Sequence, residues 1–263
     1  MTVPSRRLEP LAQRVRARIG KRIILDTTHA QLLFEDERHP WRAVPKDALL
    51  APLAGPAVAD DLDGGWWAIE LDGTRLDRAV RTWDTPPADC PALASLAVVH
   101  HDLADQWLEE EHPVYGMPKN PYHRVDALPS GRHIQVLVNG ESLATTHRPV
   151  LIIETGVPPR WYIPPGDVRW DRLTPSPHHT TCQYKGQAHY WTVDGADPPL
   201  PVWSYPEPLP EAASLAGLIG IPDDDPAVQL LINDAPAAGV GEQHGRAGAH
   251  LLGPQPPARN LDV

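Results

Sequence analysis

The chain consists of short apolar runs that are broken by proline, glycine and polar residues. Two of these runs are RIILDTTHAQLLFED (22–36) and HIQVLVNGESLATTHRPVLIIET (133–155). Both are rich in β-branched residues that favour strands, and each predicts a strand pair. Asn139-Gly140 lies inside the second run, and this dipeptide is typical of a two-residue β-hairpin turn. Further strands are predicted at WTV…PVWSYPEP (191–208) and AVQLLIND (227–234), so the pattern indicates a mainly β protein.

One segment, LPEAASLAGLIGI (209–221), has apolar positions at helical rather than alternating spacing. Glu211 falls in its first turn, where a negative charge is favourable to the helix dipole. We therefore expect a short helix here. Longer helices are not expected, because 32 of the 263 residues are proline, roughly 12% against a usual ~5%.

The pattern repeats along the chain. TTHAQLLFEDERHP (27–40) matches TTHRPVLIIETGVP (145–158) at an offset of 118 residues, and PKDALLAPL (45–53) matches PGDVRWDRL (165–173) at 120. WDTPPADCPALASLAVV (83–99) matches WSYPEPLPEAASLAGLI (203–219) at 120, drifting to 119. Three matches in one order predict an internal duplication. We expect a degenerate first copy at 14–112, a proline-rich junction at 113–131, a second copy at 132–234 and a disordered tail at 235–263.

Composition narrows the classes of function. The formal charge of −11 disfavours nucleic-acid binding, which depends on clustered lysine and arginine. No apolar run approaches the ~20 residues that cross a bilayer, and the N-terminus MTVPSRRLEP does not resemble a secretory signal. Cys90 and Cys182 cannot form a disulfide framework. We expect a cytoplasmic monomer or homodimer that binds neither nucleic acid nor membrane.

The stretch HHTTCQYKGQAHYW (178–191) carries the most reactive side chains of the chain. It combines three histidines with one of two cysteines and one of four lysines. The first copy has APLAGPAVADDLDGGW (51–66) in its place, without these residue types. This difference predicts a site that only the second copy keeps, where the first copy is shallow and acidic at Asp60, Asp61 and Asp63. The alternative is that the first loop drifted after packing constraints relaxed.

The second half resembles a bacterial family catalogued as domain of unknown function 427. The matching motifs are GESLATT (140–146), ETGVPPRWYIP (154–164), HTTCQYKGQAHYW (179–191) and WSYPEPLPE (203–211). The junction NPYHRVDALPSGRH (120–133) resembles the connector of two-copy members, and the resemblance covers the first half more weakly. It implies two tandem small β-barrel-like domains, similar to β-tent domains, each with a short helix. It brings no established reaction.

The family was once labelled a nucleotidyltransferase, and the residues do not favour that activity. The chain shows no carboxylate pair with a Gly-Ser loop that would bind a metal triphosphate. We expect no cofactor.

Lys185 is the strongest single candidate for function. It precedes Gly186, where the backbone can turn tightly or approach a ligand. A lysine here can act as a point charge on a carboxylate or phosphate, as an amine nucleophile, or as a solvated strand-end residue. On a continuous strand, Thr181 and Lys185 would share one face and Cys182 the other, which separates the lysine from the thiol.

Cys182 has two interpretations. It is a nucleophile if His178, His179 or Lys185 lower its pKa, and otherwise a small buried residue. Zinc would require about four nitrogen or sulfur ligands, such as His178, His179, Cys182 and His189; we predict no metal. The candidate catalytic residues are therefore Lys185, Cys182 and His179.

Aromatic and arginine side chains complete the predicted ligand site. Rings in a concave sheet hold planar or cationic ligands, and arginines bind anions; both types also serve as core or surface pairs. The predicted ligand-binding residues are His178, Thr181, Tyr184, Gly186, Tyr190, Trp191, Trp203, Tyr205, Arg160, Trp161 and Arg124. We expect the second copy to bind a small anionic or aromatic metabolite. The alternatives are a transferase or hydrolase-like enzyme and a structural interaction protein.

Overall fold

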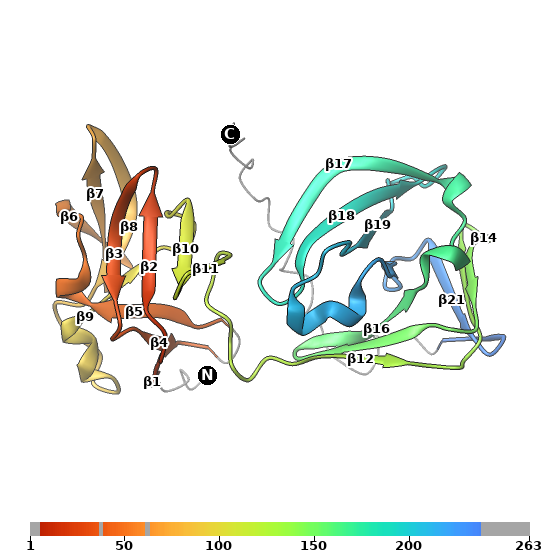
Figure 1. The fold of residues 1–263 in the computed structure, drawn as a ribbon, viewed down its shortest axis with the longest axis horizontal. Helices are drawn as coiled ribbons and strands as arrows, with labels where there is room; N and C mark the ends of the chain where they lie inside the picture. The colour runs from red at the N-terminus through yellow and green to blue at the C-terminus, as the bar shows by residue number, and fades with distance from the viewer. Residues whose placement is uncertain (1–5, 37–38, 61–63, 238–263) are drawn as a thin grey trace. The chain divides into compact units, whose positions relative to one another are not determined.

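The computed structural model describes residues 6–36, 39–60 and 64–237. The protein is mainly β, with two similar halves that each hold a pair of antiparallel sheets and very little helix (Figure 1). The chain divides into a first unit, Met1–Tyr122, and a second unit, His123–Val263. The predicted fold class is confirmed. No helix among the described residues has the length and apolar character needed to cross a membrane.

The first unit holds a seven-stranded sheet of order β1-β4-β5-β9-β8-β7-β6 and a four-stranded sheet of order β11-β10-β2-β3. The strands are β1 (Arg7–Pro10), β2 (Val15–Ile19), β3 (Arg22–Thr27), β4 (Gln31–Phe34), β5 (Trp41–Pro45), β6 (Leu53–Asp60), β7 (Gly64–Leu71), β8 (Thr74–Thr82), β9 (Leu96–Val99), β10 (Gln106–Glu109) and β11 (His112–Val114). Two short 3₁₀ helices are η1 (Lys46–Ala48) and η2 (Pro91–Ser95).

The second unit holds a seven-stranded sheet of order β12-β15-β16-β20-β19-β18-β17 and a four-stranded sheet of order β14-β13-β21-β22. The strands are β12 (Val125–Pro129), β13 (Ile134–Val138), β14 (Glu141–Thr146), β15 (Val150–Glu154), β16 (Val157–Ile163), β17 (Leu173–Cys182), β18 (Gly186–Val193), β19 (Pro201–Ser204), β20 (Ile219–Gly220), β21 (Val228–Ile232) and β22 (Ala235–Pro236). The 3₁₀ helices are η3 (Pro165–Asp167), η4 (Trp170–Arg172) and η5 (Pro210–Leu215).

Both units connect their strands in the same way, strand for strand, which supports the predicted internal duplication. Parts of the segment 113–131, the expected junction, form strands. Its beginning belongs to β11, which pairs with β10, and its end contains β12, which pairs with β15.

Strand register corrects the alignment of the two copies. Gln31 pairs with Ala43 where Val150 pairs with Tyr162, an offset of 119 residues rather than 118. Further along, Arg81 pairs with Val98 where Trp203 pairs with Gly220, an offset of 122 rather than 120. The sequence match aligned similar residue types. The hydrogen-bond register is the better guide, because it determines which side chains share a face of the sheet.

Of the predictions for local structure, the hairpin turn is confirmed, and the strand pair at 22–36 and the helix at 209–221 need correction. Asn139 and Gly140 both have positive φ, 52° and 82°, and form the turn of the β13–β14 hairpin, as predicted. The run at 22–36 forms two strands, but these belong to different sheets of the first unit. The predicted helix is the short 3₁₀ helix η5, with non-helical dihedrals at Ala212, because prolines border and begin the segment.

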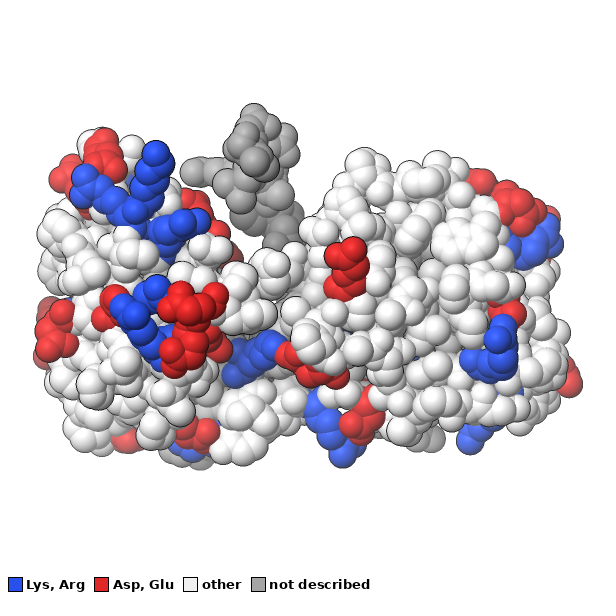
Figure 2. Space-filling model, viewed as in Figure 1, with Lys and Arg blue, Asp and Glu red and all other residues white. Residues whose placement is uncertain are grey.

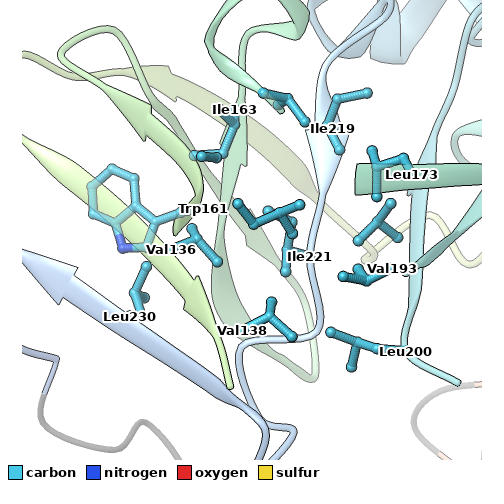
Figure 3. Close-up of a cluster of buried hydrophobic side chains, with 14 of the residues drawn as sticks. Val136, Val138, Trp161, Ile163, Leu173, Val193, Leu200, Ile219, Ile221 and Leu230 are labelled. Carbon is cyan, nitrogen blue, oxygen red and sulfur yellow. The ribbon is translucent and has the colours of Figure 1, made fainter. Parts of the chain in front are cut away.

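The seven-stranded sheet of the second unit has an apolar cluster on each of its two faces. One cluster lies between the two sheets and includes Trp161, Leu173, Val193 and Ile219 (Figure 3). The other lies on the opposite face of the seven-stranded sheet and includes Ile152, Tyr162, Tyr205 and Leu215, with η5 packed over it. The candidate site lies at the edge of this second cluster, which we call the η5-side cluster.

Candidate functional site

A buried carboxylate organises the polar groups beside the η5-side cluster. Glu154 ends strand β15, and its side chain is 12% exposed. One carboxylate oxygen, Oε2, lies 2.5 Å from the Nζ of Lys185, and the other, Oε1, lies 3.1 Å from Nε2 of His123. A buried carboxylate requires such partners, because desolvation without them is costly.

Lys185 lies in the turn between β17 and β18 rather than on a strand. β17 ends at Cys182 and β18 begins at Gly186, so the three residues between them leave the strand alternation. The prediction that Lys185 and Cys182 point to opposite faces is therefore wrong. Lys185 is 9% exposed, and its ammonium lies 5.8 Å from the centre of the Tyr205 ring.

Gly186 shapes this turn through its backbone. Its φ of +99° is a conformation that favours glycine, and a Cβ there would lie 3.3 Å from backbone atoms of Glu207 and Leu209. The amide of Leu209 donates to the carbonyl of Lys185 at 3.1 Å. The lysine is consequently positioned by a turn that packs against the segment preceding η5.

His123 enters the cluster from the segment ahead of β12. Its ring stacks on the ring of Tyr184, with 3.7 Å between centroids and 10° between planes. The stack joins the two sides of the site, since Tyr184 belongs to the β17–β18 turn. Two loop-borne side chains, His123 and Lys185, thus hold one strand-borne carboxylate.

The pair of charges controls the ionisation of both partners. Burial by itself raises the pKa of Glu154, but the hydrogen bond from His123 and the charge of Lys185 outweigh it, so the pKa is lowered. Burial by itself lowers the pKa of Lys185, but the charge of Glu154 outweighs it, with smaller contributions from Tyr162 and Cys182, so the pKa is raised. Both groups are charged at neutral pH.

Phenol and indole groups line the rest of the site. Burial raises the pKa of Tyr162 and of Tyr205, so both phenols remain protonated. The Tyr162 hydroxyl accepts a hydrogen bond from Nε1 of Trp203 at 2.9 Å. Arg160 lies over the Trp203 ring at 5.2 Å and pairs with Asp223 at 3.0 Å, so its charge is already compensated.

The first unit buries a glutamate at the corresponding position. Glu35 lies 119 residues before Glu154, and its carboxylate is bound by Arg81 at 2.7 and 3.2 Å and by Arg6 at 3.3 Å. The Arg81 side chain is only 1% exposed and belongs to strand β8. A rigid, strand-borne arginine therefore does in the first unit what a turn lysine and a histidine do in the second.

The residues around the buried glutamate also differ between the units, in a way that matches the change of its cationic partner. Arg81 corresponds to Trp203, and a Cβ on Gly64 would lie 2.8 Å from the Arg81 side chain. A Cβ on Gly220 would lie 2.6 Å from the Trp203 ring, whereas Val98 stands at that position in the first unit. Each glycine leaves room for the large side chain of its own unit.

The structure brings together only part of the predicted site. Cys182, Tyr190, Trp203 and Tyr205 belong to the η5-side cluster, next to Lys185, Tyr184 and Gly186. His178 joins them through its ring contact with Tyr190, whose hydroxyl lies 2.8 Å from Thr180.

Five predicted residues point elsewhere. His179 and Thr181 alternate with Thr180 and Cys182, so they lie on the opposite face of the hairpin, where the His179 ring contacts the His189 ring. Trp161 and Trp191 pack at the cluster between the sheets. Arg124 is exposed and pairs with Asp126 at 3.0 Å.

Metal binding by the predicted histidine and cysteine set finds no geometric basis. Among the residues that the structure describes, no group of three or more His, Cys, Asp or Glu side chains is placed to hold a metal ion. Alternation on the hairpin explains this, because it separates His179 and His189 from His178 and Cys182. The expectation of a shallow acidic site in the first copy concerns Asp61 and Asp63, which lie outside the described residues, and the Asp60 side chain is likewise not described.

The two residues that complete the site, His123 and Glu154, were absent from the predicted set. Both fall inside the motifs quoted above, in NPYHRVDALPSGRH and ETGVPPRWYIP. A correct alignment of the copies would have revealed Glu154, because it then matches the buried Glu35. No such signal exists for His123.

Comparison with known proteins agrees with the sequence resemblance for the second unit. Residues 126–231 match the family described as "Domain of unknown function (DUF427)". The match covers most of β12 and β21 and all the strands between them, with Glu154 and Lys185 inside it and His123 just before it. The first unit is not matched by the family, although its strands have the same connections. Comparison with the curated proteins gives no match.

Proposed function

We propose that the DUF427 domain of the second unit binds a small molecule beside Lys185, Glu154 and Tyr205. The observation that supports this most directly is the difference between the two units in the cationic groups that bind the buried glutamate. In the first unit the main cation on the carboxylate is a strand-borne arginine, assisted by Arg6 from the segment ahead of β1, whereas in the second unit the main cation comes from a turn and the assisting His123 from the segment ahead of β12. Groups on such segments adapt to a ligand more easily than groups within a sheet.

The chemistry of the ligand follows from the donors that remain. An ammonium has three N–H donors, and one of those of Lys185 is directed at Glu154. A carboxylate, phosphate or carbonyl oxygen of a ligand accepts from the others, while a planar part packs on Tyr205 and Tyr190. Because Glu154 neutralises the lysine, we infer a ligand with modest charge and a ring, an aromatic acid or a similar metabolite.

A lysine nucleophile is a weaker interpretation of the same site. Nucleophilic attack requires a neutral amine, and the raised pKa of Lys185 keeps the ammonium protonated. His179, one of the two predicted assisting residues, lies on the other face of the β17–β18 hairpin, whereas the second, Cys182, belongs to the η5-side cluster. We therefore propose binding rather than amine catalysis.

We propose further that the protein acts in the cytoplasm as a monomer or homodimer and binds neither nucleic acid nor membrane. Figure 2 shows basic side chains next to acidic ones on the visible face of each unit, rather than a broad basic surface. The net charge of −11 also disfavours binding to nucleic acid. Both cysteines are free thiols, as is usual in a reducing compartment.

A thermal-shift screen with a metabolite library tests the binding proposal. A ligand at a hundred times its Kd stabilises the folded protein by about 2.7 kcal/mol. The screen compares the wild type with a double variant, Glu154→Gln with Lys185→Met, which removes both charges and leaves no unpaired buried ion. Lys21→Met, an exposed turn substitution in the first unit, is the matched control.

The proposal requires at least one hit that stabilises the wild type and the control but not the double variant, with one such site per chain. A screen in which every hit stabilises all three proteins equally contradicts the proposed site.

A further inference from the structure

The outer face of the seven-stranded sheet in the first unit carries a second cluster of rings, independent of the site proposed above. The cluster, which we call the Trp41 cluster, contains Trp41, Trp66, His100 and His101. The Trp41 ring lies 6.2 Å from Trp66, 6.0 Å from His100 and 5.5 Å from His101. His100 and His101 stack at 4.7 Å with 17° between planes.

The cluster has an inner and an outer layer. Trp66 is 4% exposed and forms the support. Trp41, His100 and His101 are half-buried, so they keep part of their surface accessible. A planar molecule therefore finds ring faces on a preformed base, which lowers the entropy lost on binding.

Arg78 adds a cation at the margin of these rings. It is exposed, its guanidinium lies 5.6 Å from the centre of the Trp66 ring, and its charge acts on His100. In the part of the chain that the structure describes, no carboxylate lies within ion-pairing distance of Arg78. Arg75 on the same strand, in contrast, pairs with Asp77 at 2.8 Å.

The backbone at Arg78 is strained in a way that places this side chain. Its φ is +50°, and among the described non-glycine residues with positive φ it is the one inside a strand; the others lie in turns. It falls in a β-bulge, where the register of β7 and β8 shifts between Trp67 and Ile69. Strain of this kind costs free energy and is concentrated at functional sites.

The histidines add ring surface without charge. Burial lowers the pKa of His100; the carboxylate of Asp102 opposes this without reversing it, and the charge of Arg78 lowers the pKa further. Burial also lowers the pKa of His101. Both imidazoles are thus neutral at pH 7, and Arg78 is the exposed cation of the cluster.

The second unit carries charged groups at two of the corresponding positions. Arg160 corresponds to Trp41, and Asp223 corresponds to His101, three residues beyond the matched pair Val98 and Gly220. Arg160 and Asp223 form an ion pair there at 3.0 Å. The first unit has rings and an exposed arginine, whereas the second has an arginine that is compensated by Asp223 and, at 2.9 Å, by Asp224.

We propose that the Trp41 cluster and Arg78 form a binding site for a planar aromatic anion, an aromatic carboxylate, in the first unit. The ring of the ligand stacks on Trp41 and His100, and its carboxylate binds the guanidinium of Arg78. The first unit is then a second binding module with its own specificity rather than a degenerate partner.

Isothermal titration calorimetry on the full chain with three indole probes tests this. The probes share one ring system and differ in charge: indole-3-acetate, neutral indole-3-acetamide and cationic tryptamine. We expect indole-3-acetate to bind at least about tenfold more tightly than the amide, and tryptamine to bind least. Equal binding of the three probes, tighter binding of tryptamine, or no binding of indole-3-acetate overturns the proposal.

Arg78→Gly separates binding from folding. Glycine relieves the strain at positive φ, so this variant melts at or above the wild-type temperature while indole-3-acetate binding falls at least about tenfold. Arg75→Gly is unsuitable as a control at its strand position, so Arg75→Gln is used and leaves binding unchanged. Retained binding in Arg78→Gly, or loss of binding in Arg75→Gln as well, overturns the assignment.

The double variant Glu154→Gln with Lys185→Met identifies the unit that binds. Its affinity for indole-3-acetate equals that of the wild type if the first-unit site is correct. Loss of binding in this variant with retention in Arg78→Gly assigns the probe to the second unit and overturns the inference, without affecting the proposal made there.

Discussion

The paired charges of Glu154 and Lys185 yield a quantitative prediction for a double-mutant cycle. The two single changes are Lys185→Met and Glu154→Gln, and the third protein combines them. Each single change leaves one buried group without its main partner, and the combined change leaves a neutral amide beside an apolar chain. The cycle isolates the interaction between the pair because the substitutions are close to isosteric.

The expected magnitude follows from burial. Both side chains are only 11% and 12% exposed, and their charged atoms are 2.5 Å apart. Removing one partner of such a pair costs about 3–5 kcal/mol, whereas neutralising both costs far less. We expect Lys185→Met to lower the stability by an amount at the upper end of this range, since Glu154 then keeps only His123 as a hydrogen-bond partner. We expect a coupling free energy of about 2–4 kcal/mol.

Native-state hydrogen exchange measures the free energies of this cycle in each unit separately. Amides of β15 and β18 report on the second unit, and amides of β5 and β8 in the first unit serve as the internal reference. A loss of about 3 kcal/mol raises the exchange rate of protected amides by about two powers of ten. Exchange avoids the assumption that a two-unit chain unfolds in one step.

Additive effects in this cycle refute the reasoning. A coupling below about 0.5 kcal/mol is the value of an exposed ion pair. Such a value means that water screens the two charges in solution. The contrast between Glu154 with Lys185 and Glu35 with Arg81 then loses its physical basis.

Three further predictions concern single positions. Gly220→Ala places a Cβ 2.6 Å from an indole ring and lowers stability by about 1–3 kcal/mol in thermal melts, whereas Gly166→Ala, with nothing within 4 Å, changes it little. Arg81→Met leaves a buried carboxylate with a single cation and costs about 3–5 kcal/mol by denaturant titration; a similar effect of Arg75→Met, at an exposed position, contradicts this assignment. Because the pKa of Glu154 is lowered by folding, its stabilisation is present above the unfolded value of about 4.3 and is lost as the pH falls through the folded pKa; Glu154→Gln therefore flattens the acid limb of a stability–pH curve.

Local features of the fold were predictable because they depend on neighbouring residues. Strand runs, the Asn139-Gly140 turn and the existence of a repeat follow from periodicity and turn chemistry. The pairing of strands was harder: β3 and β4 are adjacent in sequence and lie in different sheets. Nothing in the apolar pattern distinguishes a hairpin from a strand that changes sheet.

The sequence indicated part of the candidate cluster and missed another part. The motif at 178–191 drew attention to Lys185, Cys182 and Tyr190 through its unusual residue types, and the structure places Cys182 and Tyr190 in one cluster with Tyr205. Strand alternation failed at Lys185, since the strand ends before it. Glu154 and His123 come from distant segments, and their contact with the turn depends on tertiary packing that a local pattern does not contain.

The matched exchange of Arg81 with Trp203, and of Val98 with Gly220, limits how one copy can change into the other. A single replacement of Trp203 by arginine would add a cation beside Gly220 without the glycine that makes room for it in the first unit. The reverse replacement of Arg81 would press an indole ring against Val98 and leave Glu35 short of its main counter-ion. The fitness effect of each residue therefore depends on its partners, and the two copies represent separate packing solutions with no neutral one-step path between them.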